Sequence, residues 1–266
     1  MINSIKIMSY NIWFSEEDRM ERTISLIENI KENNPDVICM QEVTKPVFDY
    51  LIKNFKNYPY HYPTKPNKNY DCMIFSKFVI SKAKEFVFKN SSMDRKIIAT
   101  LLNINVTSKE KNNLVIENFP LVVATCHFES LFKAQNQVKI EQFETAKTIL
   151  ENLLKSYGPD CPIIFCADTN IMPKEESYYI TNDNYWKDCW IESGGDKHNK
   201  FTYDTILNEN LKNRNIGVIR SRIDRIIYND IDELQLLSFR LIKGNENYIE
   251  PSDHFGIMAE IGLNKN

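Results

Sequence analysis

Six short segments of this sequence gather carboxylate, amide, hydroxyl and imidazole side chains where apolar runs end or begin. They are Ser9-Tyr-Asn11, Gln41-Glu42, Thr125-Cys-His127, Asp168-Thr-Asn170, Ser221-Arg-Ile-Asp224-Arg225 and Pro251-Ser-Asp-His254. Each one alone has an ordinary structural explanation, such as a turn cap, a solvated strand end or a hydrogen-bonded core histidine. Together they offer what phosphodiester cleavage requires: ligands for a hard cation, an oriented water, donors to the phosphorane oxygens and a stabiliser of the leaving group.

The acidic and amide side chains suit a magnesium-dependent reaction. Glu42 offers a carboxylate to Mg²⁺, which binds proteins through few carboxylates and keeps several waters. Asp168 and Asn170 stand two residues apart after an apolar run, so both can point the same way. They would present one charged acceptor and one neutral donor to a phosphate beside the cation.

Two histidines complete this set. His254 has Asp224 or Asp253 available to fix its tautomer and polarise the imidazole, and His127 offers a further donor. The six cysteines include no Cys-x-x-Cys pair and no zinc spacing. We therefore expect free, mostly buried thiols and no zinc.

Alternating and apolar runs predict the elements that must carry these side chains. Strands are expected at residues 4–12, 36–42, 71–76, 83–88, 96–106, 121–128, 162–167, 222–228, 235–242 and 256–263. Helices are expected at residues 17–33, 44–55 and 133–156, and a long irregular region follows the strand at 162–167. This pattern suggests one α/β domain over residues 1–266, with two sheets packed face to face and helices outside.

Composition narrows the classes of function. With 266 residues, 42% of them hydrophobic, and a net charge of −3, the chain can bury a core and is neither disordered nor a basic coat for nucleic acid. No stretch approaches 18 uncharged apolar residues, and the N-terminal MINSIKIMSYNIWF has no apolar run that ends at a cleavage site. We therefore expect no membrane span, no signal peptide, and an intracellular location in the nucleus, the cytoplasm or both.

The order of the polar segments along the chain resembles the endonuclease/exonuclease/phosphatase superfamily. The residues that carry the resemblance are Asn11, Gln41-Glu42, His127, Asp168-Thr-Asn170, Asp224 and Ser252-Asp253-His254. Three segments resemble its tyrosyl-DNA phosphodiesterase 2 branch: His127-Phe-Glu-Ser130, Ala167-Asp-Thr-Asn170, and Phe201-Thr-Tyr-Asp-Thr-Ile-Leu-Asn-Glu-Asn-Leu211 followed by Arg222-Ile-Asp-Arg-Ile-Ile. Tyr203, Ile223 and Ala167 stand where that branch has Trp, Phe and Gly.

The resemblance implies a four-layer αββα sandwich of two mostly antiparallel β-sheets flanked by helices, with the site at one edge. It implies that Glu42 binds Mg²⁺, or Mn²⁺ in its place, with Asn11 and Asp253 beside it. It further implies that Asp168 positions or deprotonates the attacking water, that Asn170 and His127 bond the phosphate oxygens, and that His254, held by Asp224, stabilises the transition state. The further candidates for contact with DNA are Arg95, Ser130, Tyr203, Arg222 and Arg225. For Arg95 a solvated strand start is the alternative.

The reaction implied by the resemblance is hydrolysis of the 5′-phosphotyrosyl bond of protein–DNA adducts, the damage left by a trapped topoisomerase II, with a 5′-phosphate as product. The implied substrate is DNA with a 5′-tyrosyl or peptide adduct, on a single-stranded end. Protein-linked RNA is a second substrate class, and we expect a monomer with no membrane partner. With Asn11 so near the start, we expect no room for the N-terminal ubiquitin-binding region that family members often carry.

Two other functions stay open. An abasic-site or general DNA endonuclease or exonuclease of the same superfamily would use the same metal chemistry, and relative rates on 5′-phosphotyrosyl DNA and abasic duplex would distinguish it. A catalytically inactive nucleic-acid-binding module would keep the fold without needing the complete polar set. A phosphoinositide or sphingomyelin phosphatase is disfavoured because no amphipathic, membrane-facing stretch stands out.

Overall fold

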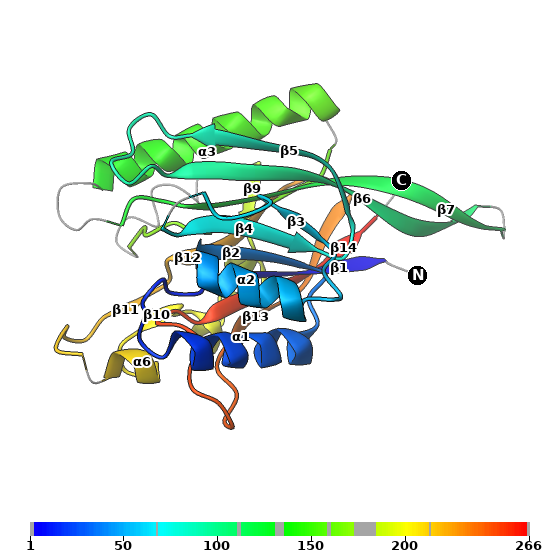
Figure 1. Ribbon diagram of the computed structural model, residues 1–266. Coiled ribbons are helices and arrows are strands. Elements are labelled where there is room, and N and C mark those ends of the chain that lie inside the picture. The colour runs from blue at the N-terminus through cyan, green and yellow to red at the C-terminus, as the bar shows by residue number, and fades with distance from the viewer. Residues whose placement is uncertain are drawn as a thin grey trace.

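The structure is a computed structural model that describes residues 3–67, 69–110, 113–130, 136–158, 161–172, 185–212 and 214–264. Two six-stranded sheets pack face to face, with helices α1 and α2 on the outer face of one and α3 on the outer face of the other (Figure 1). The three helices span Arg19–Asn33, Lys45–Asn54 and Asn136–Tyr157. None of the described helices has the length and apolar composition needed to cross a bilayer.

The first sheet has the order β13-β14-β1-β2-β4-β3. Its strands are β1 Ser4–Asn11, β2 Val37–Val43, β3 Tyr60–Tyr62, β4 Asp71–Ser76, β13 Leu234–Ile242 and β14 Gly256–Leu263. The second sheet has the order β5-β6-β7-β8-β12-β9. Its strands are β5 Val79–Val87, β6 Lys96–Glu110, β7 Asn113–His127, β8 Ile163–Asp168, β9 Trp186–Asp188 and β12 Asp224–Asn229. Beside them lie a ribbon of β10 Tyr203–Asp204 and β11 Arg220–Ser221, with the short helices α5 Cys189–Glu192, η1 Lys197–Asn199 and α6 Glu209–Lys212.

Three apolar clusters hold the layers together. One lies between the two sheets, and the other two lie between each sheet and its outer helices. The strands supply two clusters at once because successive residues of a strand face opposite sides. Thus Ile7 of β1 belongs to the cluster between the sheets, and Met8 packs with Leu26 of α1. The expected four-layer sandwich is confirmed.

Most predicted elements are present, with shifted ends. β5 begins at Val79, before the expected residue 83, and β6 and β7 form a longer hairpin than the expected strands at 96–106 and 121–128. The expected helix start at 133–135 lies outside the described residues. β3 and the short elements of the irregular region were not predicted, because two to four residues are too few for a hydrophobic period to be detected.

One parallel pair in each sheet determines where the polar strand ends meet. β1 is parallel to β2, with Asn11 opposite Gln41, and β7 is parallel to β8, with His127 opposite Asp168. β12 runs antiparallel to β8 and begins at this edge, with Asp224 opposite Asp168. Since parallel strands share their carboxyl ends, the catalytic-type residues gather at one edge of the sandwich.

Candidate active site

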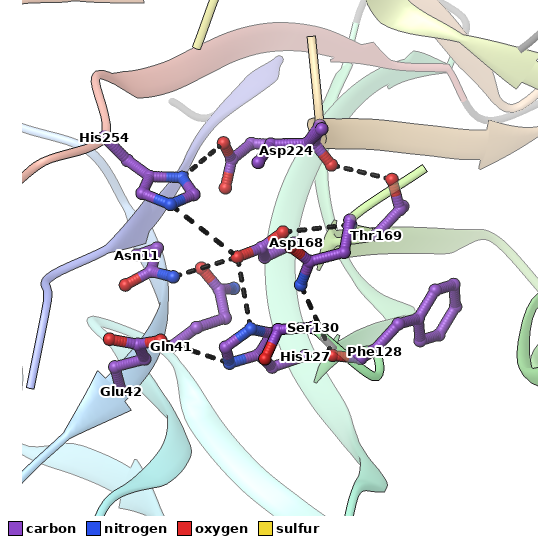
Figure 2. Close-up of polar contacts among 12 residues, drawn as sticks. Asn11, Gln41, Glu42, His127, Phe128, Ser130, Asp168, Thr169, Asp224 and His254 are labelled. Carbon is purple, nitrogen blue, oxygen red and sulfur yellow. Dashed lines mark hydrogen bonds and ion pairs between the residues drawn. The ribbon is translucent and has the colours of Figure 1, made fainter. Parts of the chain in front are cut away.

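Asp168, the last residue of β8, is the centre of the polar contacts in Figure 2. Its Oδ2 accepts a hydrogen bond from Asn11 Nδ2 at 2.9 Å and lies 3.3 Å from His127 Nε2 and 4.0 Å from His254 Nε2. Its Oδ1 accepts a hydrogen bond from the backbone N–H of Asn170 at 3.1 Å. That bond stabilises the left-handed conformation of Asn170, whose φ is 50°. One buried carboxylate therefore holds together residues from both sheets and two loops.

His254 and Asp224 form a buried pair beside Asp168. His254 Nδ1 lies 2.8 Å from Asp224 Oδ2, and the backbone N–H of Asp224 donates to Thr202 Oγ1 at 3.1 Å. Burial alone would lower the pKa of His254, but the charge and hydrogen bond of Asp224, followed by the charges of Asp253 and Asp168, raise it well above its ordinary value. The imidazole is thus held as a cation that presents its Nε2–H toward Asp168.

Glu42 lies near the end of β2 in a left-handed conformation, with a φ of 63°. Such a backbone costs a non-glycine residue about 1–3 kcal/mol and is concentrated at functional sites. Its Oε2 accepts a hydrogen bond from the backbone N–H of Phe14 at 2.9 Å. Burial, and then the charge of Asp253, raises the pKa of Glu42 to about 7. Burial also raises the pKa of Asp253.

These two carboxylates fit a hard divalent cation. A cation would offset both the burial and the repulsion that raise the pKa of Glu42, and Mg²⁺ prefers carboxylate oxygens. Among the described residues, Asp168, Asp224 and His254 also bring ligand-type atoms within 4.8 Å of one another. In that group, however, hydrogen bonds to Asn11 and between Asp224 and His254 already occupy atoms that a metal would need. Glu42 and Asp253 are therefore the better fit.

A cavity of about 240 Å³ opens beside these groups. Its lining consists of Asn11, Glu42, His127, Ser130, Lys139, Asp168, Asn170, Met172, Tyr203, Ile219, Ser221, Ile223, Asp253 and His254. A second hollow of about 230 Å³ shares Glu42 and His127 with it and is otherwise lined by residues 69–72 and 92–96. A bound phosphodiester could therefore extend into both hollows from a reacting bond at Glu42 and His127.

Three of the candidate DNA-binding residues lie at these hollows. The ring of Tyr203 lies 5.3 Å from the ring of His254, centroid to centroid, on the cavity wall, and Ser130 lines the same cavity. Arg95 is buried in the second hollow and is not a solvated strand start. Its Nη1 lies 3.0 Å from His127 Nδ1, and its Nη2 donates to Ser130 Oγ at 3.4 Å.

The expected DNA contact of Arg222 and Arg225 is wrong. Their exposed fractions are 2% and 1%, and both guanidinium groups bind the buried carboxylate of Asp188. Arg222 also lies over the ring of Trp190, with its Cζ 4.6 Å from the ring centroid. The carboxylate of Asp188 neutralises both guanidinium groups inside the protein, and removing it would leave their charges poorly compensated in a buried environment.

Lys139 is a residue of the cavity wall that the sequence did not single out. It is 6% exposed, and its Nζ donates to the backbone carbonyl of Asn170 at 3.0 Å. The sequence contained a sign of its burial. Lys139 stands four residues before Phe143, so it lies on the apolar side of the predicted helix. Phe14 and Tyr70, whose rings stack at 4.8 Å beside Glu42, lie in loops and carried no such signal.

Comparison with known proteins agrees with this geometry. The sequence model of the endonuclease/exonuclease/phosphatase family matches residues 8–254. Tyrosyl-DNA phosphodiesterase 2 from Xenopus laevis is 25% identical over 264 residues, which cover 96% of this chain and 66% of the relative. The 5′-tyrosyl-DNA phosphodiesterase of Caenorhabditis elegans is 26% identical over 261 residues, again 96% and 66% of the two chains.

A solved structure shares the whole fold. The crystal structure of D. rerio TDP2 complexed with single-strand DNA product superposes with a TM-score of 0.81 at 20% identity, covering 98% of this chain and 100% of that one. The chain described here spans 66% of the length of the two curated relatives, just under two thirds.

Proposed function

The chain belongs to the endonuclease/exonuclease/phosphatase family, and we propose that it is a metal-dependent phosphodiesterase that hydrolyses 5′-phosphotyrosyl bonds of protein–DNA adducts and leaves a 5′-phosphate. One observation carries the proposal. A single cavity is lined by two carboxylates that can bind a cation, Glu42 and Asp253, and by a second group of polar side chains that surrounds Asp168. The names of the relatives, which describe 5′-tyrosyl-DNA phosphodiesterases, support the choice of bond.

Glu42 and Asp253 would hold Mg²⁺, or Mn²⁺ in its place. When bound there, the cation would neutralise charge on the phosphate and on the departing phenolate oxygen. The amide of Asn11 is engaged at both ends, because its oxygen accepts a hydrogen bond from the backbone N–H of Trp13 at 3.0 Å and its nitrogen donates to Asp168 Oδ2. We therefore assign Asn11 the task of holding Asp168 in place.

Asp168 orients the attacking water and accepts its proton as the water oxygen bonds to phosphorus. Hydrogen bonds from Asn11 and from the backbone of Asn170 fix its two oxygens, so its position is set before substrate arrives. His127 and the side chain of Asn170 donate to the phosphate oxygens. Preorganised donors of this kind need no rearrangement as charge develops in the transition state.

His254 stabilises the negative charge that accumulates on the phosphoryl group. Asp224 keeps its imidazole charged and aimed through Nε2 at the space in front of Asp168. The leaving tyrosine requires little further help, because the pKa of a phenol is about 10, far below that of an alcohol. A tyrosyl ester therefore suits a site in which none of the described residues needs to protonate the leaving group.

A single-stranded DNA end is the substrate that fits the cavity best. Tyr203 offers an aromatic face for base stacking, an interaction of about 1–3 kcal/mol per base. The D. rerio relative is described with a single-strand DNA product, which supports the same mode here. Protein-linked RNA ends are a second substrate class, and we expect residues 1–266 to act as one catalytic domain, as a monomer, in the nucleus or cytoplasm.

The proposal is tested with two oligonucleotides, a single strand with a 5′-phosphotyrosine and a duplex with an abasic site. Wild type in Mg²⁺ should release tyrosine far faster than it cuts the duplex, and Asp168→Asn should abolish both. Asp49→Asn is the matched control, because Asp49 is an exposed carboxylate paired with Lys45 on α2. Faster cleavage of the abasic duplex would favour the nuclease alternative. Binding of the oligonucleotide without turnover would favour the inactive module.

A further inference from the structure

The buried contact between Arg95 and His127 specifies where the proton of His127 resides. Arg95 Nη1 lies 3.0 Å from His127 Nδ1, and both residues are buried. A guanidinium group has only donors and remains protonated in proteins, so Nδ1 must be the acceptor. A neutral imidazole with an accepting Nδ1 carries its proton on Nε2. That Nε2–H then faces Asp168 Oδ2 at 3.3 Å.

This tautomer also leaves Glu42 available for a cation. Glu42 Oε1 lies 3.7 Å from His127 Nδ1, so a proton on Nδ1 would be close to this carboxylate. Because Arg95 occupies the Nδ1 lone pair, His127 donates toward Asp168 and the phosphate instead. Burial and the charge of Arg95 both disfavour the protonated imidazole, in agreement with the donor–acceptor argument.

Glu129 fixes the loop that delivers Arg95. Glu129 as a whole is 1% exposed. Its Oε2 accepts a hydrogen bond from Ser91 Oγ at 2.7 Å, and its Oε1 accepts one from the backbone N–H of Ser92 at 2.9 Å. Ser91 Oγ in turn accepts a hydrogen bond from the backbone N–H of Arg95 at 2.8 Å. Gln142 of α3 donates to the same carboxylate at 3.3 Å. A buried chain of contacts therefore runs from α3 through Glu129 and Ser91 to Arg95.

We propose that Glu129 and Arg95 are positioning residues that hold His127 in the Nε2–H tautomer, so that it can donate to the substrate phosphate. Glu129 belongs to the His127-Phe-Glu-Ser130 segment, in which the carboxylate has no direct role in the proposed chemistry. Its contribution is to lock the loop of residues 91–95 against the end of β7. The consequence for rate depends on the proposed function, whereas the tautomer itself does not.

The tautomer is measured by long-range ¹H–¹⁵N correlation spectra of the imidazoles in the folded protein. The chain has four histidines, so His127→Gln identifies the relevant signals. Wild type should show a protonated Nε2 and an unprotonated Nδ1 at His127. Arg95→Met removes the donor but leaves the partners of Glu129 in place, and it should convert His127 to a mixture of tautomers. A wild-type Nδ1–H form, or an unchanged tautomer in Arg95→Met, would overturn the proposal.

Glu129→Gln tests the loop, with Glu141→Gln as the matched control. Glu141 is an exposed residue of α3. Its carboxylate accepts a hydrogen bond at 3.0 Å from Asn90, which lies in the loop between β5 and β6 that also carries Ser91. Glu129→Gln should mix the tautomers of His127 and lower kcat about 10–100-fold with little change in KM, the usual effect of losing a supporting hydrogen-bond partner. Glu141→Gln should change neither. If Glu129→Gln matches Glu141→Gln in both measurements, Glu129 does not position His127. If Glu129→Gln fails to fold, Arg95→Met still decides the case.

Failure of this inference is distinguishable from failure of the proposed function. If wild type has the Nε2–H tautomer but releases no tyrosine, the proposed function fails and the positioning role stands. If wild type releases tyrosine but His127 has the other tautomer, the positioning role fails and the proposed function stands.

Discussion

Replacing Asp188 by asparagine should destabilise the fold strongly while leaving nucleic-acid binding intact. Asp188 Oδ1 and Oδ2 lie 2.7 and 2.8 Å from Arg222 Nη1, and Oδ2 lies 3.1 Å from Arg225 Nη1, all in side chains that are at most 2% exposed. Asparagine keeps the shape and the acceptor that caps α5, but it removes the negative charge that Asp188 places against both buried guanidinium groups. Breaking a buried ion pair in this way costs about 3–5 kcal/mol. For a domain of this size the expected fall in Tm is roughly 6–20 °C.

The assay is thermal and denaturant unfolding, with Asp230→Asn as the control. Asp230 pairs with the neighbouring Lys187 at 2.6 Å, but both side chains are more than a third exposed, so its loss should cost less than about 1 kcal/mol. The salt dependence of binding to a single-stranded 5′-phosphorylated oligonucleotide should be the same in both variants. The reasoning would be refuted if Asp188→Asn were as stable as Asp230→Asn and the salt dependence became steeper, because the released arginines would then contact phosphates.

Glu42→Gln removes one carboxylate of the proposed cation site, so turnover should fall about 10²–10³-fold and more Mg²⁺ should be needed. Near-normal rates in limiting Mg²⁺ would exclude Glu42 as a ligand. Asp168→Asn and His254→Ala should each be folded and nearly inactive. The double variant should lose far less kcat than the product of the two single losses, and a loss equal to that product would mean that the residues act independently. Tyr203→Ala should raise KM for 5′-phosphotyrosyl single strands but leave hydrolysis of a small tyrosyl-phosphate analogue nearly unchanged; equal losses on both would assign Tyr203 to the fold or the chemistry. Burial lowers the pKa of His127 to about 3 from an ordinary 6.5, so the unfolded chain binds more protons between these values. Stability should therefore fall by up to about 1.4 kcal/mol per pH unit on acidification through that window, and His127→Gln should remove this slope in unfolding measurements.

Much of the site could be predicted because it lies at strand ends. An apolar run that ends in a carboxylate or an imidazole is visible in the sequence, and parallel strands bring such ends to one edge. Asn11, His127 and Asp168 meet for this reason, as the registers of β1 with β2 and β7 with β8 show. Asp224 reaches the same edge from the opposite direction on the antiparallel β12.

Contacts that depend on the irregular region could not be predicted. Asp188, which binds Arg222 and Arg225, stands more than 30 residues before them in a segment without hydrophobic periodicity. The alternation of β12 does predict that Arg225 faces away from the site. Successive strand residues face opposite sides, and the neighbouring Asp224 faces the site. The position of Arg95 against His127 likewise depends on the loop that Glu129 holds, and nothing local in the sequence specifies that contact.

Isotope tracing of the products tests the central proposal most directly. A 5′-phosphotyrosyl oligonucleotide is incubated with the protein and Mg²⁺ in H₂¹⁸O, and the products are identified by mass spectrometry. Attack of water on phosphorus predicts an oligonucleotide 5′-phosphate that contains ¹⁸O and tyrosine that contains none. Release of phosphotyrosine from a 5′-hydroxyl end, cleavage at an internal phosphodiester alone, or intact substrate would contradict it.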